Sequence, residues 1–291
     1  MIVELLRAMR PKQWTKNGVV FAALVFDAKL TTPSYLFRTL LGFVIFCFIS
    51  GVVYVINDLV DIQKDRQHPK KRHRPLAAGR LSVRAAQVGI GIILGVGLPL
   101  GFYVQPLFGL IVSGYLVLQV AYSFVLKNIV IVDVLTIAAG FVLRVAGGAA
   151  LVEAERFSPW LYVCTVLLAL FLGLSKRRGE LVALQENANN HRAILQEYNL
   201  PLLDEMISMV VSTTVLAYAL YTFDPSNPHL PPNKAMMLTI PFVLYSVFRY
   251  LYLIHLRGET APPDEVLLRD RPLQIAIALW GVTALALLYI H

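Results

Sequence analysis

The stretch from Ser34 to Asp65 reads SYLFRTLLGFVIFCFISGVVYVINDLVDIQKD, a long apolar run that ends in a polar motif. Residues 34–57 match the roughly 20 apolar residues that are needed to cross a lipid bilayer. If the helix continues through the motif, three polar side chains lie four residues apart on one face, and a fourth lies beside them. These residues are Asn57, Asp61 and Asp65, with Asp58 as the fourth. The stretch therefore predicts a membrane helix whose end carries a face of carboxylates.

The carboxylates at this helix end repel one another unless a cation lies among them. Hard oxygen ligands of this kind suit Mg²⁺, which proteins share with the phosphate oxygens of a substrate. A run of basic residues follows in the chain: Lys70, Lys71, Arg72, Arg74, Arg80 and Arg84. The simpler interpretation is a solvated helix end with incidental salt bridges. A membrane setting favours the metal, because ionisable groups there usually have a function.

The composition excludes an ordinary soluble domain. The chain has 291 residues, of which 57% are hydrophobic and 15% are charged, with a mean hydropathy of +0.64. Such values predict a polytopic protein surrounded by membrane lipids. Both cysteines, Cys47 and Cys164, lie in apolar runs, so we expect neither a disulfide framework nor a cysteine metal site. The basic residues behind the net charge of +8 are confined to short loops, which argues against a nucleic-acid partner.

Nine apolar runs are long enough, or nearly so, to cross the membrane. They lie near residues 18–30, 34–57, 83–104, 107–126, 129–152, 159–175, 202–223, 235–256 and 272–290. The first is short and is expected to be tilted or partly inserted. The predicted fold class is therefore all-α: a polytopic membrane protein with about nine transmembrane helices bundled around an active-site cavity that faces the cytoplasm. We expect one domain over residues 1–291, with cytoplasmic loops near 58–82 and 176–201.

The basic residues also predict the orientation of the chain. With the N-terminus in the cytoplasm, most of the 26 Lys and Arg residues fall into cytoplasmic segments, as the positive-inside rule requires. The carboxylate helix end and every long polar loop then face the cytoplasm, and the C-terminus lies on the opposite side. We therefore expect a multi-pass protein of the cell membrane.

Four further polar groups lie at or inside the predicted helix ends. They are the segment Arg10–Asn17 (RPKQWTKN), the pair Tyr122 and Lys127, Arg144 within the fifth span, and the segment Ser175–Glu180 (SKRRGE). Each has a simpler explanation: respectively a membrane-surface anchor, a snorkelling lysine, a structural ion pair and a positive-inside stop signal. Together they surround one carboxylate cluster with cations, which suits Mg²⁺ and a polyanion such as a diphosphate.

The motif Asn57-Asp58-x-x-Asp61-x-x-x-Asp65, at the end of the second of nine predicted helices, resembles the UbiA superfamily of intramembrane prenyltransferases. Three other segments and the tail Asp264–Asp270 (DEVLLRD) resemble the decaprenyl-phosphate phosphoribosyltransferase branch of that superfamily. The segments are Arg10-Pro11-x-Gln13-Trp14-x-Lys16-Asn17, His68-Pro69-x-Lys71-Arg72-x-Arg74-Pro75 and Tyr122-Ser123-x-x-Leu126-Lys127. The likeness covers nearly the whole chain.

One departure from the aromatic prenyltransferases of this superfamily concerns the donor. Those enzymes carry a second Asp-x-x-x-Asp motif on a later cytoplasmic helix end, where this chain has Lys176-Arg177-Arg178-Gly179-Glu180. Basic residues in place of acids suit a donor with phosphate at both ends. The resemblance implies phosphoribosyl diphosphate as that donor and a polyprenyl phosphate lipid as the acceptor.

The resemblance also implies roles for individual residues. The metal, Mg²⁺, and the diphosphate are assigned to Asn57, Asp58, Asp61 and Asp65. Lys71 and Arg72 are assigned to the charge that develops on the leaving group, so they join the three aspartates as catalytic residues. The remaining substrate-binding residues are Lys16, Asn17, Tyr122, Lys127, Arg144, Lys176 and Arg177. We name no general base, because the acceptor phosphate is already anionic near neutral pH.

Two other functions stay open on the sequence alone. Transfer of a prenyl group from a prenyl diphosphate to an aromatic or other acceptor is common in the superfamily. A transporter for an anionic solute would also place charges inside the membrane, although transporters usually show broken helices near the midplane and internal repeats. The sequence specifies neither the length of the lipid nor whether the protein forms a homo-oligomer.

Overall fold

The computed structural model describes residues 1–69, 71–154, 158–186, 193–225, 227–261 and 263–290, whose regular secondary structure is entirely helical. Eight helices in this part of the chain are long and apolar enough to cross a membrane. They are α3 (Pro33–Val60), α5 (Val83–Val104), α6 (Pro106–Phe124), α7 (Val132–Leu151), α8 (Pro159–Glu186), α9 (Leu200–Thr222), η5 (Ala235–Thr239) with α10 (Ile240–Leu256), and α12 (Arg271–Tyr289). The chain is therefore an all-α, multi-pass membrane protein, which confirms the predicted fold class.

The first predicted span, residues 18–30, is not an α-helix of spanning length. It is divided between the 3-10 helix η1 (Pro11–Phe21) and the five-residue helix α2 (Ala22–Phe26). The helical segment ends beside the buried Asp27, where Ala28 adopts a left-handed conformation with φ of 52°. Each of the other eight predicted runs falls on one of the eight long helices.

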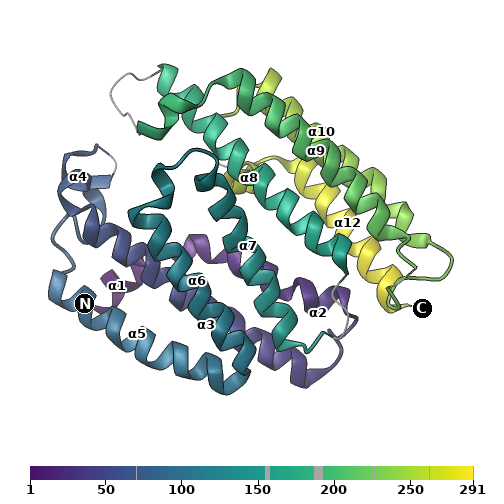
Figure 1. The fold of residues 1–291 in the computed structure, drawn as a ribbon, viewed down its shortest axis with the longest axis horizontal. Helices are drawn as coiled ribbons and strands as arrows, with labels where there is room; N and C mark the ends of the chain where they lie inside the picture. Colours follow the sequence, from purple (N-terminus) through teal and green to yellow (C-terminus); the bar gives the residue numbers. More distant parts are fainter. Residues whose placement is uncertain (70, 155–157, 187–192, 226, 262, 291) are drawn as a thin grey trace. The chain divides into compact units, whose positions relative to one another are not determined.

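The described residues form two compact units, and the first comprises residues 1–25, 29–125 and 143–154. In this unit α3 packs against α5, α6 and η1, and the short helix α1 (Ile2–Ala8) packs against α3 (Figure 1). The core places Phe46 of α3 edge-to-face with Phe108 and Tyr115 of α6, at ring-centroid distances of 5.5 Å. The single domain expected over residues 1–291 stays a prediction.

Two glycines of α7 allow close packing in the first unit. A Cβ atom at Gly148 would overlap the carbonyl group of Val20, and one at Gly147 would lie 2.8 Å from the ring of Phe46. Small residues permit such backbone approach between membrane helices. The end of α7, which carries Arg144, is thereby held against η1, which carries Asn17.

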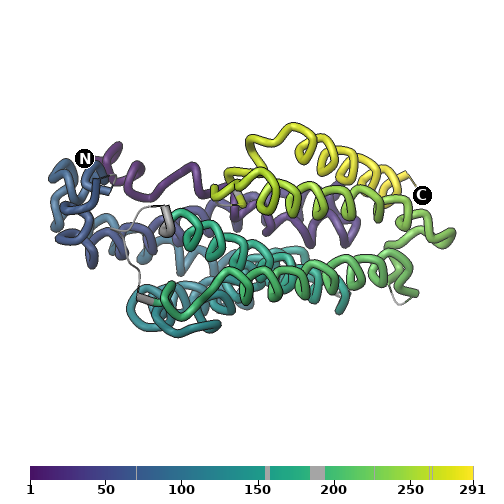
Figure 2. The backbone as a smooth tube through the Cα atoms, turned by 90° about the horizontal axis from the view of Figure 1, so that it is seen from above, coloured from purple at the N-terminus to yellow at the C-terminus, as the bar shows by residue number. Residues whose placement is uncertain are grey.

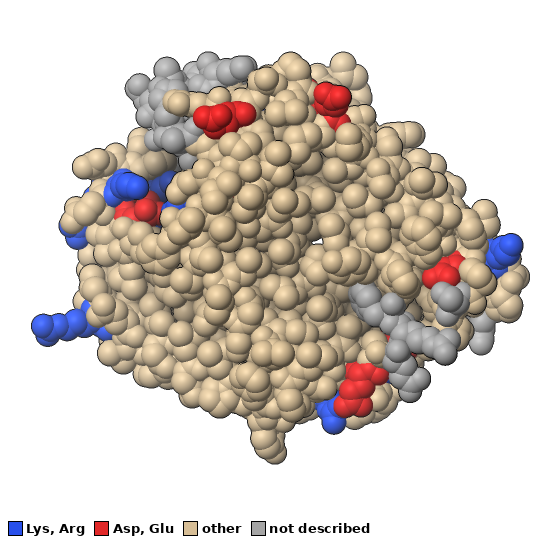
Figure 3. Space-filling view, in the orientation of Figure 1, with Lys and Arg blue, Asp and Glu red and all other residues tan. Residues whose placement is uncertain are grey.

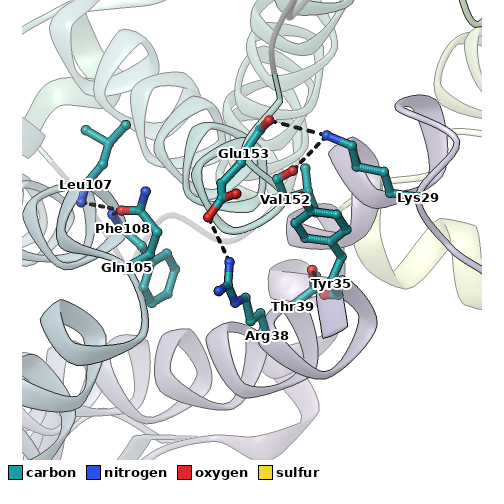
Figure 4. A network of polar contacts seen from close by, with 9 residues as sticks. All are labelled: Lys29, Tyr35, Arg38, Thr39, Gln105, Leu107, Phe108, Val152 and Glu153. Carbon is teal, nitrogen blue, oxygen red and sulfur yellow. Dashed lines mark hydrogen bonds and ion pairs between the residues drawn. The ribbon is translucent and has the colours of Figure 1, made fainter. Parts of the chain in front are cut away.

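One end of the first unit is tied together by charged side chains (Figure 4). The Nζ atom of Lys29 donates to the carbonyl oxygens of Val152 (2.9 Å) and Glu153 (3.3 Å), just beyond α7. Arg38 of α3 pairs with the Glu153 carboxylate at 2.8 Å. The lysine satisfies carbonyl groups that a helix end leaves without partners, and its charge complements the negative end of the helix dipole.

The second unit comprises residues 26–28, 126–142 and the described part of 155–291. Helices α8 and α9 run side by side, and α12 packs along α10 (Figures 1 and 2). Two short 3-10 helices, η3 (Leu126–Asn128) and η4 (Ala193–Glu197), contact each other, and α11 (Pro263–Arg269) contacts α8. Tyr198, which follows η4, belongs to the same hydrophobic core as Phe171 of α8.

The surface is that of a protein surrounded by lipid. On the face shown in Figure 3, most of the surface belongs to uncharged residues. Apolar side chains such as Phe37, Val88 and Ile92 expose more than half of their area. Soluble proteins rarely expose so much contiguous apolar surface, whereas lipid tails accommodate it without cost.

The predicted cytoplasmic loops are partly helical. The first, residues 58–82, contains α4 (Ile62–Gln67) and η2 (Lys71–His73). The second, residues 176–201, begins inside α8, because that helix extends to Glu186 and does not end near residue 175. Lys70 and residues 187–192 of these two loops lie outside the described residues.

Candidate functional site

The helix that carries the polar motif is interrupted at one residue. Helix α3 ends at Val60, Asp61 has φ of −96° and ψ of 11°, and α4 begins at Ile62. Hydrogen bonds of helical spacing nevertheless cross the break. The Asp61 amide donates to the Asn57 carbonyl (3.0 Å), and the Asp65 amide donates to the Asp61 carbonyl (2.8 Å). The four-residue spacing is therefore kept, although the expected continuous helix is not.

Two carboxylates of the motif are buried and share one arginine. Asp58 and Asp65 are each 2% exposed. The Nη1 atom of Arg74 donates to Asp58 Oδ1 (3.1 Å) and to Asp65 Oδ2 (2.7 Å), and the Nη2 atom of Arg10 donates to Asp58 Oδ1 (2.5 Å). We call these four residues the Asp58 cluster. Its arginines supply the positive charge that neighbouring buried carboxylates require.

The other oxygen of Asp58, Oδ2, is buried and has no hydrogen-bond partner among the described residues. A buried acceptor left without a partner costs about 1–3 kcal/mol, and more when it is charged. This atom is therefore suited to a cation or a donor that comes from outside the protein. Asn57 and Asp61, which are half-buried, add oxygen donors at the same helix end.

The chemistry of this donor set fits Mg²⁺, which prefers carboxylate and amide oxygens. The side chains are not already arranged around one point, since the described residues contain no group of three His, Cys, Asp or Glu positioned to hold a metal. Arg74 instead lies between two of the expected ligands, Asp58 and Asp65.

The resemblance assigned Lys71 and Arg72 to the charge on the leaving group, and Arg10 and Arg74 were not among the predicted site residues. Lys71 and Arg72 lie on η2 with exposed side chains, and their proposed role in catalysis stays a prediction. Arg10 adopts a left-handed conformation (φ 54°) and lies 4.7 Å from the ring centroid of Tyr54 on α3. Both arginines directly precede a proline, but so does Arg271, so this pattern did not distinguish them in the sequence.

Asn17 and Arg144, both predicted to bind substrate, meet inside the first unit. The Nε atom of Arg144 donates to Asn17 Oδ1, and its Nη2 atom donates to the hydroxyl of Tyr115, each at 2.7 Å. Asn17 in turn donates to Ser50 Oγ at 3.1 Å. Both of these partners of Arg144 are neutral groups, and their oxygen atoms solvate the guanidinium.

This second group shares α3 with the Asp58 cluster. Ser50 precedes Asp58 by eight residues, which is about 12 Å along an α-helix. Two more of the predicted substrate-binding residues belong to the first unit and are half-buried: Lys16 on η1 and Tyr122 near the end of α6. The first unit therefore carries the expected metal ligands together with four of the seven other predicted substrate-binding residues, Lys16, Asn17, Tyr122 and Arg144.

The other predicted residues belong to the second unit. Lys127 on η3 and Lys176 on α8 are half-buried. Arg177 is 0% exposed, and its Nε and Nη1 atoms donate to the carboxylates of Asp133 and Glu180, each at 2.5 Å. This burial favours a structural role for Arg177 over the predicted contact with a phosphate. Asp133 was missed, although a carboxylate inside a predicted span is itself a signal.

Comparison with known proteins agrees with this architecture. The family model described as the UbiA prenyltransferase family matches residues 18–264. The decaprenyl-phosphate phosphoribosyltransferase of Corynebacterium glutamicum is 30% identical over 98% of this chain and 87% of its own length. The enzyme of the same name from Mycolicibacterium smegmatis is 27% identical over 99% of this chain and 93% of its own length. The structure of a UbiA homologue from Archaeoglobus fulgidus bound to GPP and Mg²⁺ has a TM-score of 0.74 and 21% identity, and the match covers 98% of this chain and 99% of that one.

Proposed function

The chain belongs to the UbiA prenyltransferase family, and we propose that it transfers the 5-phosphoribosyl group from phosphoribosyl diphosphate to a polyprenyl phosphate. Membership of this family makes it a membrane-embedded transferase. The relatives from C. glutamicum and M. smegmatis, which are similar over nearly the whole chain, carry the name of this activity. Within the chain, the observation that supports diphosphate chemistry is the buried Asp58 Oδ2, which lacks a partner among the described residues and sits on a carboxylate that two arginines contact.

In the proposed reaction, the bond between ribose C1 and the diphosphate breaks, and the diphosphate leaves with the electron pair. A phosphate oxygen of the lipid forms the new bond to C1. Arg10 and Arg74 add positive charge where the leaving group becomes more negative, which stabilises the transition state more than the ground state. Lys71 and Arg72, exposed on η2, are proposed to act on the same charge.

Mg²⁺ is the proposed cofactor, held by Asn57, Asp58, Asp61 and Asp65. Bound there, it would act as a Lewis acid on the diphosphate oxygens. This assignment is supported by the oxygen donor set, by Asp58 Oδ2, which has no partner among the described residues, and by the Mg²⁺ bound with GPP in the Archaeoglobus homologue.

We propose that the site faces the cytoplasm, because the basic residues concentrate in segments on the side of the N-terminus. A C-terminus on the opposite side then requires a ninth crossing by η1 and α2. A 3-10 helix rises about 2.0 Å per residue and an α-helix about 1.5 Å, so these two elements together extend about 30 Å, the thickness of a hydrocarbon core. The polyprenyl chain is expected to lie among the apolar helices.

The test is direct incubation of the purified protein in detergent or nanodiscs. Phosphoribosyl diphosphate labelled in the ribose, Mg²⁺ and a panel of polyprenyl phosphates are supplied, and label in the lipid phase is measured. We expect Mg²⁺-dependent labelling that requires the lipid phosphate. The proposal is wrong if the protein ignores phosphoribosyl diphosphate and consumes a prenyl diphosphate with an aromatic acceptor instead.

That second outcome defines the alternative function, UbiA-type prenyl transfer. The observation that favours it is the fold shared with a homologue that binds GPP. Lys176 on α8 favours phosphoribosyl diphosphate, because a further cation suits a donor with phosphate at both ends; the neighbouring Arg177 and Arg178 are paired with carboxylates. Replacing the half-buried Lys176 by Ala should raise the KM for one of the two phosphate substrates, and the affected substrate identifies which phosphate the lysine contacts.

A further inference from the structure

Three segments of the second unit converge where α7 begins: the turn after η3, the middle of α8, and Tyr198 just beyond η4. Tyr198 is 4% exposed and belongs to the hydrophobic core of this unit. Nothing in the proposed reaction uses this tyrosine. Its hydroxyl group nevertheless makes two hydrogen bonds to a segment 65 and 67 residues away in the sequence.

The Tyr198 hydroxyl fixes the turn that leads into α7. It accepts a hydrogen bond from the Ile131 amide and donates one to Asp133 Oδ1, each at 2.8 Å. Ile131 has φ of 67°, a left-handed conformation that is unfavourable for a β-branched residue. Such a conformation persists only where surrounding contacts enforce it. The amide hydrogen bond from Ile131 to Tyr198 is one such contact.

Arg177 completes the arrangement from α8. Its Nε atom donates to Asp133 Oδ2 at 2.5 Å, so each oxygen of this carboxylate has a donor: Tyr198 on Oδ1 and Arg177 on Oδ2. Asp133 and Arg177 are both 0% exposed. We call Tyr198, Asp133 and Arg177 the Asp133 cluster. It joins three separate segments through charge-assisted hydrogen bonds, which are stronger than neutral ones.

The cluster lies next to a residue with a proposed function. Lys127, on η3, precedes Ile131 by four residues, and η3 also contacts η4 directly. The intervening backbone is held by further hydrogen bonds, from the Ile129 amide to the Leu126 carbonyl (3.2 Å) and from the Asp133 amide to the Ile129 carbonyl (3.0 Å). The backbone that carries Lys127 therefore leads directly into the turn that the Asp133 cluster fixes.

We propose that Tyr198, Asp133 and Arg177 are positioning residues that hold the η3 turn so that Lys127 reaches a phosphate of the substrate. The inference rests on the proposed function in that it takes a phosphate as the partner of Lys127. Arg177 then contributes to the site through Asp133 and not through direct contact with a ligand. A lysine carried by a fixed turn binds a phosphate with less loss of backbone entropy than a lysine on a mobile turn.

The Tyr198 hydroxyl remains a donor under working conditions. Burial raises the pKa of this phenol to about 12, and its hydrogen bond to Asp133 favours the protonated form in the same direction. The phenol therefore does not titrate near neutral pH, and the effect of its hydroxyl on substrate binding should be the same across that range.

The test begins with Tyr198→Phe, which removes the hydroxyl and keeps the ring in the core. We expect the KM of one phosphate substrate to rise about tenfold, which corresponds to about 1.4 kcal/mol. We expect kcat to stay within about twofold of the wild-type value, because the hydroxyl makes no contact specific to the transition state. The substrate affected should be the one whose KM also rises in Lys127→Ala.

Tyr218→Phe is the matched control. It deletes the same atom from another buried tyrosine of the second unit, whose hydroxyl bonds with Thr239 Oγ1 (2.6 Å) and accepts from Trp280 Nε1 (2.7 Å). We expect a similar fall in the apparent Tm of this variant and an unchanged KM. An equal rise in KM in both variants would show that general loss of stability causes the effect.

The decisive measurement is the double variant Lys127→Ala with Tyr198→Phe. If Tyr198 acts through Lys127, removing its hydroxyl should change KM by less than about twofold once the lysine is absent. Fully additive effects of the two substitutions would overturn the proposal. If the wild type turns over a prenyl diphosphate and not phosphoribosyl diphosphate, the KM values of the two single variants and the double variant are measured with that donor instead. The coupling between Tyr198 and Lys127 is then judged separately from the proposed function.

Discussion

The Asp58 and Asp133 clusters each contain ion pairs between aspartate and arginine, and they differ in how far the arginine side chains are exposed. In the Asp58 cluster, the side chains of Arg10 and Arg74 are 31% and 27% exposed, and Asp58 Oδ2 has no hydrogen-bond partner among the described residues. In the Asp133 cluster, both members of the ion pair are 0% exposed, and each carboxylate oxygen has a donor.

This difference separates a site that can exchange ligands from one that cannot. A partly exposed arginine can leave a buried carboxylate when a cation replaces it there, because its own charge then stays solvated by water or binds a phosphate. A fully buried arginine cannot leave, because an unpaired buried charge costs several kcal/mol. The Asp58 cluster is therefore suited to bind a metal and a diphosphate, and the Asp133 cluster is suited to hold the chain in place.

The largest expected effect is a loss of turnover when a carboxylate of the acidic motif, which contributes Asp58 and Asp65 to the Asp58 cluster, is replaced. Asp61→Asn keeps the size of the side chain and removes a charged oxygen ligand, so kcat should fall about a thousandfold, or about 4 kcal/mol. The measurement is single-turnover transfer at saturating donor and Mg²⁺. Glu4→Gln, which alters a carboxylate paired with Arg7 and Arg80 in the same unit, is the control and should retain activity. Near-normal turnover by Asp61→Asn would show that this carboxylate is structural.

The second effect is on stability, in the Asp133 cluster. Asp133→Asn removes the fully buried one of the two carboxylates that contact Arg177, the other being Glu180, and should lower the free energy of unfolding by about 3 kcal/mol, measured by unfolding in mixed micelles. Asp65→Asn should cost less than half as much, because Arg74 is partly exposed and can turn to solvent. Equal losses in the two variants would remove the distinction between an exchangeable and a fixed cluster.

A third prediction concerns metal binding in the absence of donor. Arg74 competes with a cation for Asp58 and Asp65, so Arg74→Gln should raise the affinity for Mg²⁺ alone about tenfold, as measured by calorimetry. Arg7→Gln removes an exposed arginine of the same unit that pairs with Glu4, and it should leave the affinity unchanged. Weaker Mg²⁺ binding in Arg74→Gln would mean that the arginine supports the metal site and does not compete with it.

The smallest expected effect is that of pH on the stability that the Tyr198 hydroxyl contributes. Because the pKa of Tyr198 is raised to about 12, the stability that its hydroxyl contributes is fully present below about pH 10 and is lost as the pH rises from 10 to 12. The difference in apparent Tm between wild type and Tyr198→Phe should therefore be constant from about pH 6 to 9. A difference that changes within this range would assign the titration to another group.

The fold was largely predictable because its signals are local. Eight apolar runs gave eight helices, and the motif lies at the end of α3 as expected. The errors occurred where local signals are weak. Residues 18–30 are apolar but form η1 and α2, and α8 continues through the charged Lys176–Arg178, because a basic segment does not by itself end a helix.

The types of residue that form the site could be predicted from the sequence. Which basic residue pairs with which carboxylate was much less predictable. The spacing of the acidic motif placed carboxylates on one helix end, and two of them do share a cation. Which of the six basic residues after the motif supplies that cation depends on the path of the chain through α4 and η2. Arg74 reaches the carboxylates, whereas Lys71 and Arg72 lie exposed on η2.

The sequence by itself determined a membrane protein of apolar helices with one acidic motif and many cations, because hydrophobicity and charge act within a few residues of chain. The tertiary structure alone decided which of these charges meet. Arg10 pairs with Asp58 across 48 residues, Tyr198 bonds Asp133 across 65, and Arg144 bonds Asn17 across 127. Contacts over such separations depend on how helices pack, and packing decides whether an arginine stays exchangeable at a surface or is buried as a permanent support.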